Sequence, residues 1–96
     1  MRIKPSETLL TGKWVEQGAE IIGDPTAKRI DDLVQNHLAL LGRDASGWDA
    51  LYRDPNDSRL WELTYPQSEL QGGGPPQLKV ISADEAKAKY GSLAEP

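Results

Sequence analysis

The chain has 96 residues, a length that fits one domain and leaves no room for a second independent core. Its formal net charge of −4 argues against direct binding to nucleic acid, whose phosphates select Lys and Arg, but permits binding to a basic protein surface. The absence of cysteine excludes disulfides and thiolate metal sites, and the longest apolar run is far below the roughly 20 residues that a membrane helix needs.

The N-terminal part of the chain predicts a short hairpin. The first ten residues, MRIKPSETLL, lack the apolar region of a secretory signal, so we expect a cytoplasmic protein. Trp14, Val15, Ile21 and Ile22 are strand formers, and Gly18 offers a turn between them. We therefore predict strands over residues 13–17 and 20–23.

The next segment predicts the long helix of the domain. Asp24 is a good N-cap, and Pro25 suits the first helical position. Apolar residues then recur at spacings of three and four, at Ala27, Ile30, Leu33, Val34, Leu38 and Leu41. Gly42 is placed to end the helix in the left-handed conformation. The prediction is one amphipathic helix that runs from Pro25 to about Leu41.

A second hairpin is predicted around the turn sequence DPND, residues 54–57. Proline presets φ in such a turn, and Asn and Asp bond their own backbone. The flanking strands are residues 48–53 and 59–65. In the second strand Trp61, Leu63 and Tyr65 alternate with polar residues, which is typical of a half-buried strand with its aromatic side inward. Glu62 is therefore expected to face solvent.

The C-terminal part begins with a loop that contains three glycines and two prolines. The prolines at 75 and 76 remove two amide donors, so the loop is poorly suited to cradle an anion. It is either a shaped turn or a loop that contacts a partner. A short strand follows in QLKVIS, and Ser82 with Glu85 forms a capping box for a short helix to about Tyr90. Residues 91–96 are predicted to be a flexible tail.

These elements predict a single α+β domain over residues 1–96. Its architecture is a small antiparallel β-sheet of about five strands, with one long helix packed on one face and a short C-terminal helix. The predicted core consists of Trp14, Ile30, Val34, Leu38, Trp61, Leu63, Leu78 and Val80.

The sequence offers little that indicates catalysis. His37 is the only histidine and lies at the edge of the apolar stripe, where a packed histidine with one nitrogen bonded is typical. Asp54, Asn56 and Ser58 match the first three ligands of a calcium loop, but arginine and tyrosine occupy its glycine and glutamate positions. We therefore predict no enzyme, no metal and no cofactor. The alternative is a small hydrolase or transferase that uses carboxylates with His37.

Four stretches resemble the immunity protein 27 family of bacterial polymorphic toxin systems. They are TGKW at 11–14, GDPTAKRI at 23–30, GWDALYRDPNDSRLWELTYPQSELQGGGPPQL at 47–78 and ISADEAKAKY at 81–90. The resemblance covers nearly the whole chain. It implies a cytoplasmic protein that protects its producer by binding and blocking a cognate toxin, without catalysis. The identity of the toxin and the oligomeric state do not follow from it.

We predict the toxin contact on the exposed face of the second hairpin and on the glycine-proline loop. Carboxylates there would pair with Arg and Lys of a basic toxin, and three residues without side chains would let a partner's backbone approach. The alternatives are an ordinary solvated sheet face and a toxin that docks on the helix. The predicted contact residues are Asp54, Asp57, Glu62, Gln67, Glu69, Gly72, Gly73 and Gly74.

Overall fold

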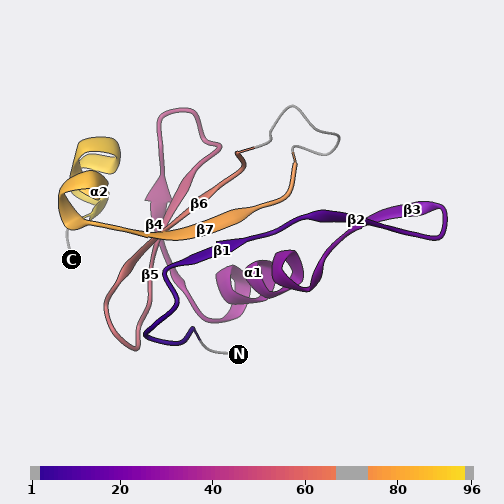
Figure 1. Ribbon diagram of the computed structural model, residues 1–96. Helices are drawn as coiled ribbons and strands as arrows, with labels where there is room; N and C mark the ends of the chain where they lie inside the picture. Colours follow the sequence, from indigo (N-terminus) through magenta and orange to yellow (C-terminus); the bar gives the residue numbers. More distant parts are fainter. Residues whose placement is uncertain (1–2, 67–73, 95–96) are drawn as a thin grey trace.

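The computed structural model describes residues 3–66 and 74–94 and shows the predicted α+β architecture (Figure 1). The main element is a five-stranded antiparallel sheet in the order β1-β7-β6-β5-β4. Its strands are β1 (Leu9–Thr11), β4 (Ala39–Arg43), β5 (Ala50–Arg53), β6 (Leu60–Thr64) and β7 (Gln77–Ile81). The remaining elements are the separate hairpin β2 (Trp14–Gln17) and β3 (Glu20–Gly23), the helices α1 (Pro25–Asn36) and α2 (Ala83–Tyr90), and the 3-10 helix η2 (Gly91–Ala94).

Helices cover both faces of the sheet, so the domain has two apolar layers. On one face Ile30 and Leu33 of α1 pack in a cluster with Trp61 and Leu78. On the other face α2 and η2 join a second cluster, which contains Leu51, Leu60, Ile81, Ala86, Tyr90 and Ala94. Because successive side chains of a strand point to opposite faces, the central strands are buried on both sides.

The first helix begins where the sequence predicts but ends earlier. Oδ1 of Asp24 accepts a 2.8 Å hydrogen bond from the amide of Ala27, which confirms the N-cap. The helix ends at Asn36, and His37 is its C-cap. Residues 39–43 form β4, which pairs with β5, so the predicted helix to Leu41 is wrong. The backbone amides and carbonyls of β4 find their hydrogen-bond partners in β5, and the spacing of apolar residues in the sequence does not reveal this pairing.

The predicted core is mostly confirmed. Five of its members are buried, namely Ile30, Leu38, Trp61, Leu63 and Leu78. Val34 and Val80 are partly buried and pack against the first cluster. Trp14 is also only partly buried, because its strand belongs to the separate hairpin. The capping box of Ser82 and Glu85 is present at the start of α2.

The end of the chain packs against the sheet as far as the structure describes it. Residues 91–94, which were predicted to begin a flexible tail, form η2, and Ala94 is buried in the second cluster. Gly42 of β4 approaches this helix closely, because a Cβ built on it would lie 2.5 Å from Cδ1 of Leu93. None of the helices among the described residues has the length and apolar character to cross a membrane.

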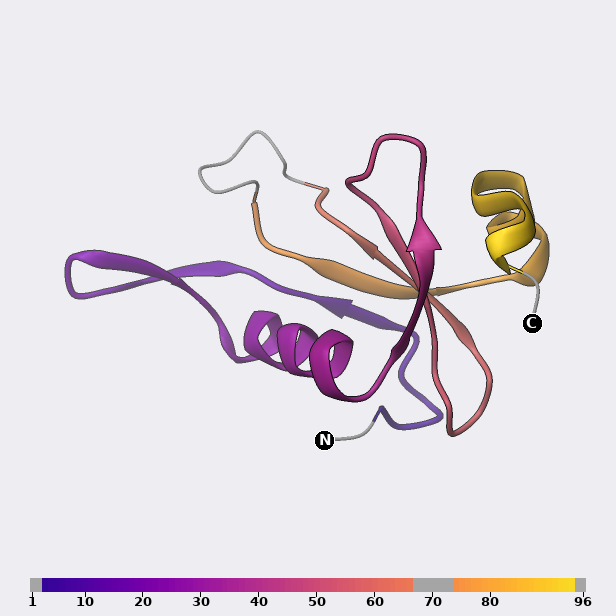
Figure 2. The same ribbon diagram turned by 180° about the vertical axis from the view of Figure 1, so that it is seen from behind.

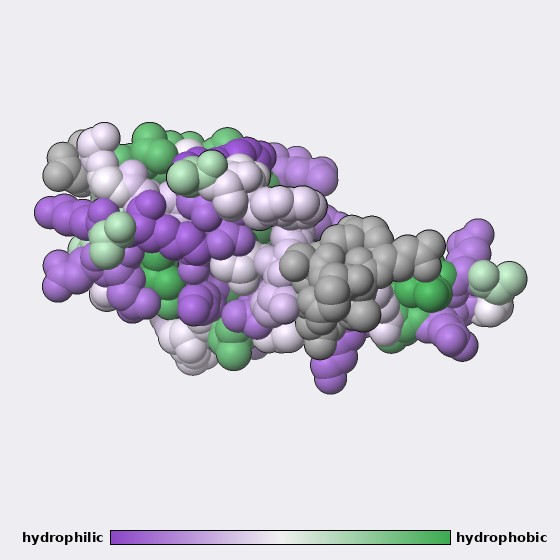
Figure 3. Space-filling view, turned by 90° about the horizontal axis from the view of Figure 1, so that it is seen from above, coloured by the Kyte–Doolittle hydropathy of each residue, from purple (hydrophilic) through white to green (hydrophobic). Residues whose placement is uncertain are grey.

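The β2–β3 hairpin gives the molecule its elongated shape, with extents of 45 × 28 × 19 Å. In Figures 1 and 2 it projects past the sheet and past α1, at the end of the molecule opposite α2. In the space-filling view of Figure 3 this end carries a green hydrophobic area between hydrophilic side chains. The hairpin itself was predicted, but its projection from the domain was not.

Candidate functional site

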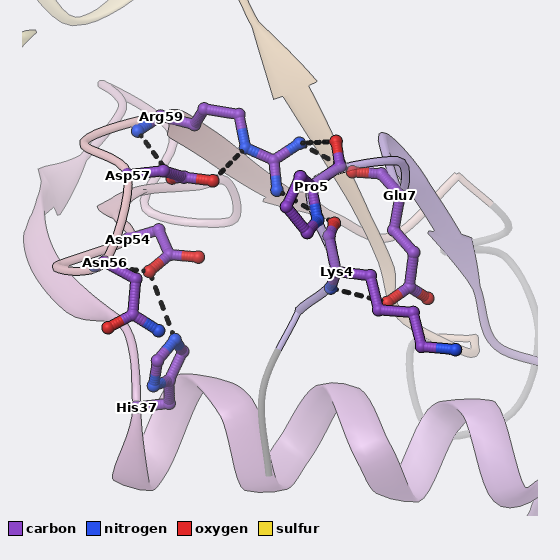
Figure 4. Close-up of polar contacts among 8 residues, drawn as sticks. All are labelled: Lys4, Pro5, Glu7, His37, Asp54, Asn56, Asp57 and Arg59. Carbon is purple, nitrogen blue, oxygen red and sulfur yellow. Dashed lines mark hydrogen bonds and ion pairs between the residues drawn. The ribbon is translucent and has the colours of Figure 1, made fainter.

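The turn between β5 and β6 holds Asp54 inside the protein, not at its surface. The residue is fully buried. Its Oδ1 accepts a 2.8 Å hydrogen bond from the amide of Asn56 and lies 3.2 Å from Nε2 of His37 (Figure 4). An aspartate that bonds an amide two residues on is a common device of turns. The exposed role predicted for Asp54 is therefore contradicted by its burial, and its carboxylate joins this turn to the end of α1.

Asp57 is exposed, as predicted, but its carboxylate is already paired. Nε of Arg59 donates a 2.6 Å hydrogen bond to Oδ2 of Asp57, and the amide of Arg59 donates one of 3.1 Å to Oδ1. Desolvation raises the pKa of Asp57, but the hydrogen bonds from Arg59 outweigh it, and the pKa is lowered from its ordinary value. The same guanidinium donates to the carbonyls of Glu7, at 2.7 Å, and Lys4, at 3.2 Å (Figure 4). This pair therefore fastens the N-terminal segment to the turn.

Glu62 faces α2 and is buried, with only 5% of its surface exposed. Its Oε2 accepts a 2.8 Å hydrogen bond from the hydroxyl of Tyr90 and lies 2.7 Å from Nζ of Lys89. Nζ of Lys89 also lies 2.5 Å from Oδ2 of Asp49. Desolvation lowers the pKa of Lys89, but hydrogen bonds to Asp49 and Glu62 outweigh it and raise the pKa to about 12. The prediction that Glu62 faces solvent is wrong, because the second face of the sheet is covered by α2.

The remaining predicted contact residues belong to the glycine-proline loop. Gln67, Glu69, Gly72 and Gly73 lie outside the described residues, so their role stays a prediction. Gly74 is described and is buried, with a φ of 79° that favours glycine.

The exit of this loop is packed against the first strand and the first helix. The carbonyl oxygen of Pro76 accepts a 2.8 Å hydrogen bond from the amide of Gly12. A Cβ built on Gly12 would lie 2.9 Å from that oxygen and 2.9 Å from Cβ of Ala27. The exit therefore depends on a close backbone approach and serves the fold.

The arrangement around His37 does not favour the catalytic alternative. That alternative needs a pocket that joins His37 to two carboxylates, and among residues 3–66 and 74–94 the imidazole of His37 has one hydrogen-bond partner, Asp54. The carboxylate of Asp54 is fully buried, which keeps it away from a substrate. In the part of the chain that the structure describes, no group of three His, Cys, Asp or Glu side chains could hold a metal ion.

Two exposed regions were missed by the sequence analysis. Trp48, in the loop between β4 and β5, is 62% exposed and meets Tyr65 in an edge-to-face contact with ring centroids 6.5 Å apart. The second region is the β2–β3 hairpin, in which Val15 is 40% and Ile21 60% exposed. Strand-forming residues around Gly18 predict the two strands of this hairpin, but they do not show that the hairpin lies outside the main sheet.

A pocket of about 360 Å³ lies at the root of the hairpin. Its lining includes Trp14, Lys28, Asp31, Tyr65 and Gly74. The indole nitrogen of Trp14 is buried and has no hydrogen-bond acceptor within the described ranges. Desolvation raises the pKa of Asp31 above its ordinary value. The pocket joins the hairpin, the start of α1 and the exit of the glycine-proline loop into one continuous surface.

Comparison with known proteins gives one family match. A family model described as immunity protein 27 matches residues 16–82, which is most of the chain. The match begins inside β2 and ends at Ser82, so it spans α1 and all of β3 to β7. No curated protein and no solved structure matches the chain.

Proposed function

We propose, because the chain belongs to the immunity protein 27 family, that it binds and neutralises a cognate bacterial toxin domain by direct protein–protein contact. The match over residues 16–82 is the observation that carries this proposal. An immunity protein acts by occupying its partner, so no catalysis is required of it. A cytoplasmic site of action is part of the same proposal.

The surface of the domain is consistent with a binding protein. Tryptophan is largely buried on average in folded proteins, and Trp, Tyr and Arg dominate the energetics of interfaces. Here Trp48 is largely exposed beside Tyr65, and the net charge of −4 would favour encounter with a basic toxin. Buried Asp54 and Glu62 contribute to the fold, and the exposed carboxylate of Asp57 is paired with Arg59.

Co-expression tests the proposal. The probe is the toxin domain encoded by the neighbouring gene, expressed in a host cell with and without this chain. We expect the cells to grow only when the chain is present, and the two purified proteins to form a stoichiometric complex by size-exclusion chromatography. Growth arrest in the presence of well-folded chain, together with no complex, would overturn the proposal.

A further inference from the structure

The β2–β3 hairpin is a free-standing ribbon whose register places apolar side chains on both of its faces. Val15 pairs with Ile22, and Glu16 pairs with Ile21. Directly paired residues point to the same face, and neighbouring residues point to opposite faces. Val15 and Ile22 therefore share one face with Glu20, whereas Ile21 shares the other face with Glu16.

Val15 and Ile21 are exposed and Ile22 is half-buried, and the fold of the domain does not require apolar side chains on both faces of the ribbon. A two-stranded hairpin is marginal by itself in water, and a ribbon that only bridged two elements would need one apolar face at most. The tip is a two-residue turn in which Gly18 has a φ of 65°, and a Cβ built on Gly18 would meet nothing within 4 Å. The hairpin therefore extends into open space, well beyond its contacts with the domain (Figure 1).

Hydrogen bonds and close packing join the root of the hairpin to the start of α1. The amide of Asp24 donates a 2.8 Å hydrogen bond to the carbonyl of Lys13, and Oδ1 of Asp24 accepts one of 3.2 Å from the amide of Lys13. A Cβ built on Gly23 would lie 3.0 Å from Cβ of Ala27. The N-cap of α1 thus also fixes where the ribbon leaves the domain. A fixed direction lowers the entropy that binding must overcome.

The charge of the ribbon indicates the chemistry of its partner. Residues 14–23 contain Glu16 and Glu20, one on each face, and no Lys or Arg. One face therefore presents Val15 and Ile22 beside Glu20, and the other presents Ile21 beside Glu16. A surface that complements both faces must have two walls, and each wall must carry apolar side chains near Lys or Arg.

We infer that the β2–β3 hairpin inserts into a cleft of the cognate toxin domain that is lined by basic and apolar side chains, and blocks that cleft. This inference rests on the proposed function. Insertion is favoured over flat docking, because flat docking would leave Val15 and Ile22, or Ile21, in water. The alternative partner of the hairpin is the hairpin of a second copy of this chain. Pairing two such hairpins would bring four glutamates together, and residues 14–23 contain no Lys or Arg to compensate their charge.

Binding of the neighbouring gene's toxin domain, in a catalytically inactive form, to the full chain tests the inference. Ile21→Ser removes an exposed aliphatic side chain from the hairpin, and Leu40→Ser does the same on edge strand β4, where Leu40 is also exposed. Glu20→Lys reverses a hairpin charge, and Asp84→Lys makes the same charge change at an exposed position of α2, at the opposite end of the molecule. Circular dichroism and urea unfolding check that each variant is folded.

The hairpin variants should be selectively impaired. We expect Ile21→Ser to weaken the affinity about tenfold and Leu40→Ser less than about twofold, since interface energy concentrates in a few central residues. Glu20→Lys should slow association about tenfold at low salt, with a smaller effect at high salt, and Asp84→Lys should not. Hydrogen exchange of residues 14–23 should slow when the toxin domain is added.

The outcomes separate the inference from the proposed function. If the parent chain binds and protects while both hairpin variants match their controls, the hairpin inference is overturned and the proposed function stands. If the parent chain neither binds nor protects, both fail. A dimer that Ile21→Ser dissociates, with toxin binding unchanged, would assign the hairpin to self-association and likewise overturn the inference.

Discussion

The hydroxyl of Tyr90 donates a 2.8 Å hydrogen bond to Oε2 of Glu62 and so joins α2 to the centre of the sheet. Both residues are buried, and they lie on strand β6 and at the last turn of α2. Desolvation and the hydrogen bond to Glu62 raise the pKa of Tyr90, which keeps the phenol protonated as a donor. A buried carboxylate needs such partners, because an uncompensated charge inside a protein is costly.

Tyr90→Phe should therefore destabilise the domain by about 1–2 kcal/mol, since it deletes the donor but keeps the ring in the second cluster. Glu62 would keep its 2.7 Å contact with Lys89, which limits the loss. Urea unfolding measures the effect. Tyr65→Phe is the matched control, because no hydrogen bond of the Tyr65 hydroxyl is found among the described residues. Equal stabilities of the two variants would contradict the assigned role.

The pair of Glu7 and Arg29 should make stability depend on pH in the acid range. The guanidinium donates to Oε2 of Glu7 at 2.6 Å and to Oε1 at 2.7 Å. These bonds, with that from the amide of Lys4, lower the pKa of Glu7 from 4.5 to about 2. Because the folded pKa is the lower one, the stabilisation is complete above pH 4.5 and is lost as the pH falls toward 2.

Glu7→Gln should remove this pH-dependent part, about 1 kcal/mol after allowance for the partial exposure of the pair. Free energies of unfolding measured between pH 2 and pH 5 check the prediction, with the range set by the pKa of Glu7. Arg29→Gln should likewise reduce the dependence of the unfolding free energy on pH in this range. The double variant with Glu7→Gln should show no further reduction. If the unfolding free energy of Glu7→Gln depends on pH as steeply as that of the parent chain, other carboxyl groups cause the loss of stability in acid.

Truncating the central tryptophan should unfold the domain. Trp61 has no exposed surface and packs in the first cluster, so Trp61→Ala should cost about 3–5 kcal/mol, which is most of the stability of a small domain. Trp48→Ala removes the same atoms from an exposed site and should cost less than about 1 kcal/mol. Thermal unfolding followed by circular dichroism distinguishes them, and a folded Trp61→Ala would contradict the packing described above.

Replacing His37 should leave protection intact. His37→Ala removes the group 3.2 Å from Oδ1 of Asp54, so a stability loss of about 1–3 kcal/mol is expected from the buried carboxylate. The co-expression growth test at reduced temperature, where the variant stays folded, provides the measurement. A folded His37→Ala protein that no longer protects would revive the catalytic alternative.

Local signals in the sequence predict the fold well where a few neighbouring residues determine the structure. Asp24 before Pro25 marks the start of α1, and Ser82 with Glu85 marks the start of α2. In each cap a side chain accepts a hydrogen bond from the backbone amide three residues further along the chain. The turn at residues 54–57 is predicted for the same reason. In these places the physical cause lies within one turn of the chain.

The errors concern residues whose surroundings come from distant segments. Leu38 and Leu41 continue the spacing of the helix, but they face opposite clusters once β4 pairs with β5. The alternation of Glu62 with apolar neighbours predicts that it points to water, although Tyr90 and Lys89 cover it. Alternation identifies the two faces of a strand, but it cannot tell whether a helix later in the chain covers the second face.

The pairing of β1 with β7 has a consequence for the synthesis of the protein. Leu10 aligns with Leu78, so the sheet acquires its first strand only after β7 has left the ribosome. Strands that are so far apart in the sequence pair late and more slowly than neighbouring strands, because a long loop of chain must be closed. A nascent or truncated chain without β7 would leave the edges of β1 and β6 open to other polypeptides. Fragments that end before β7 should therefore aggregate and should not bind a partner.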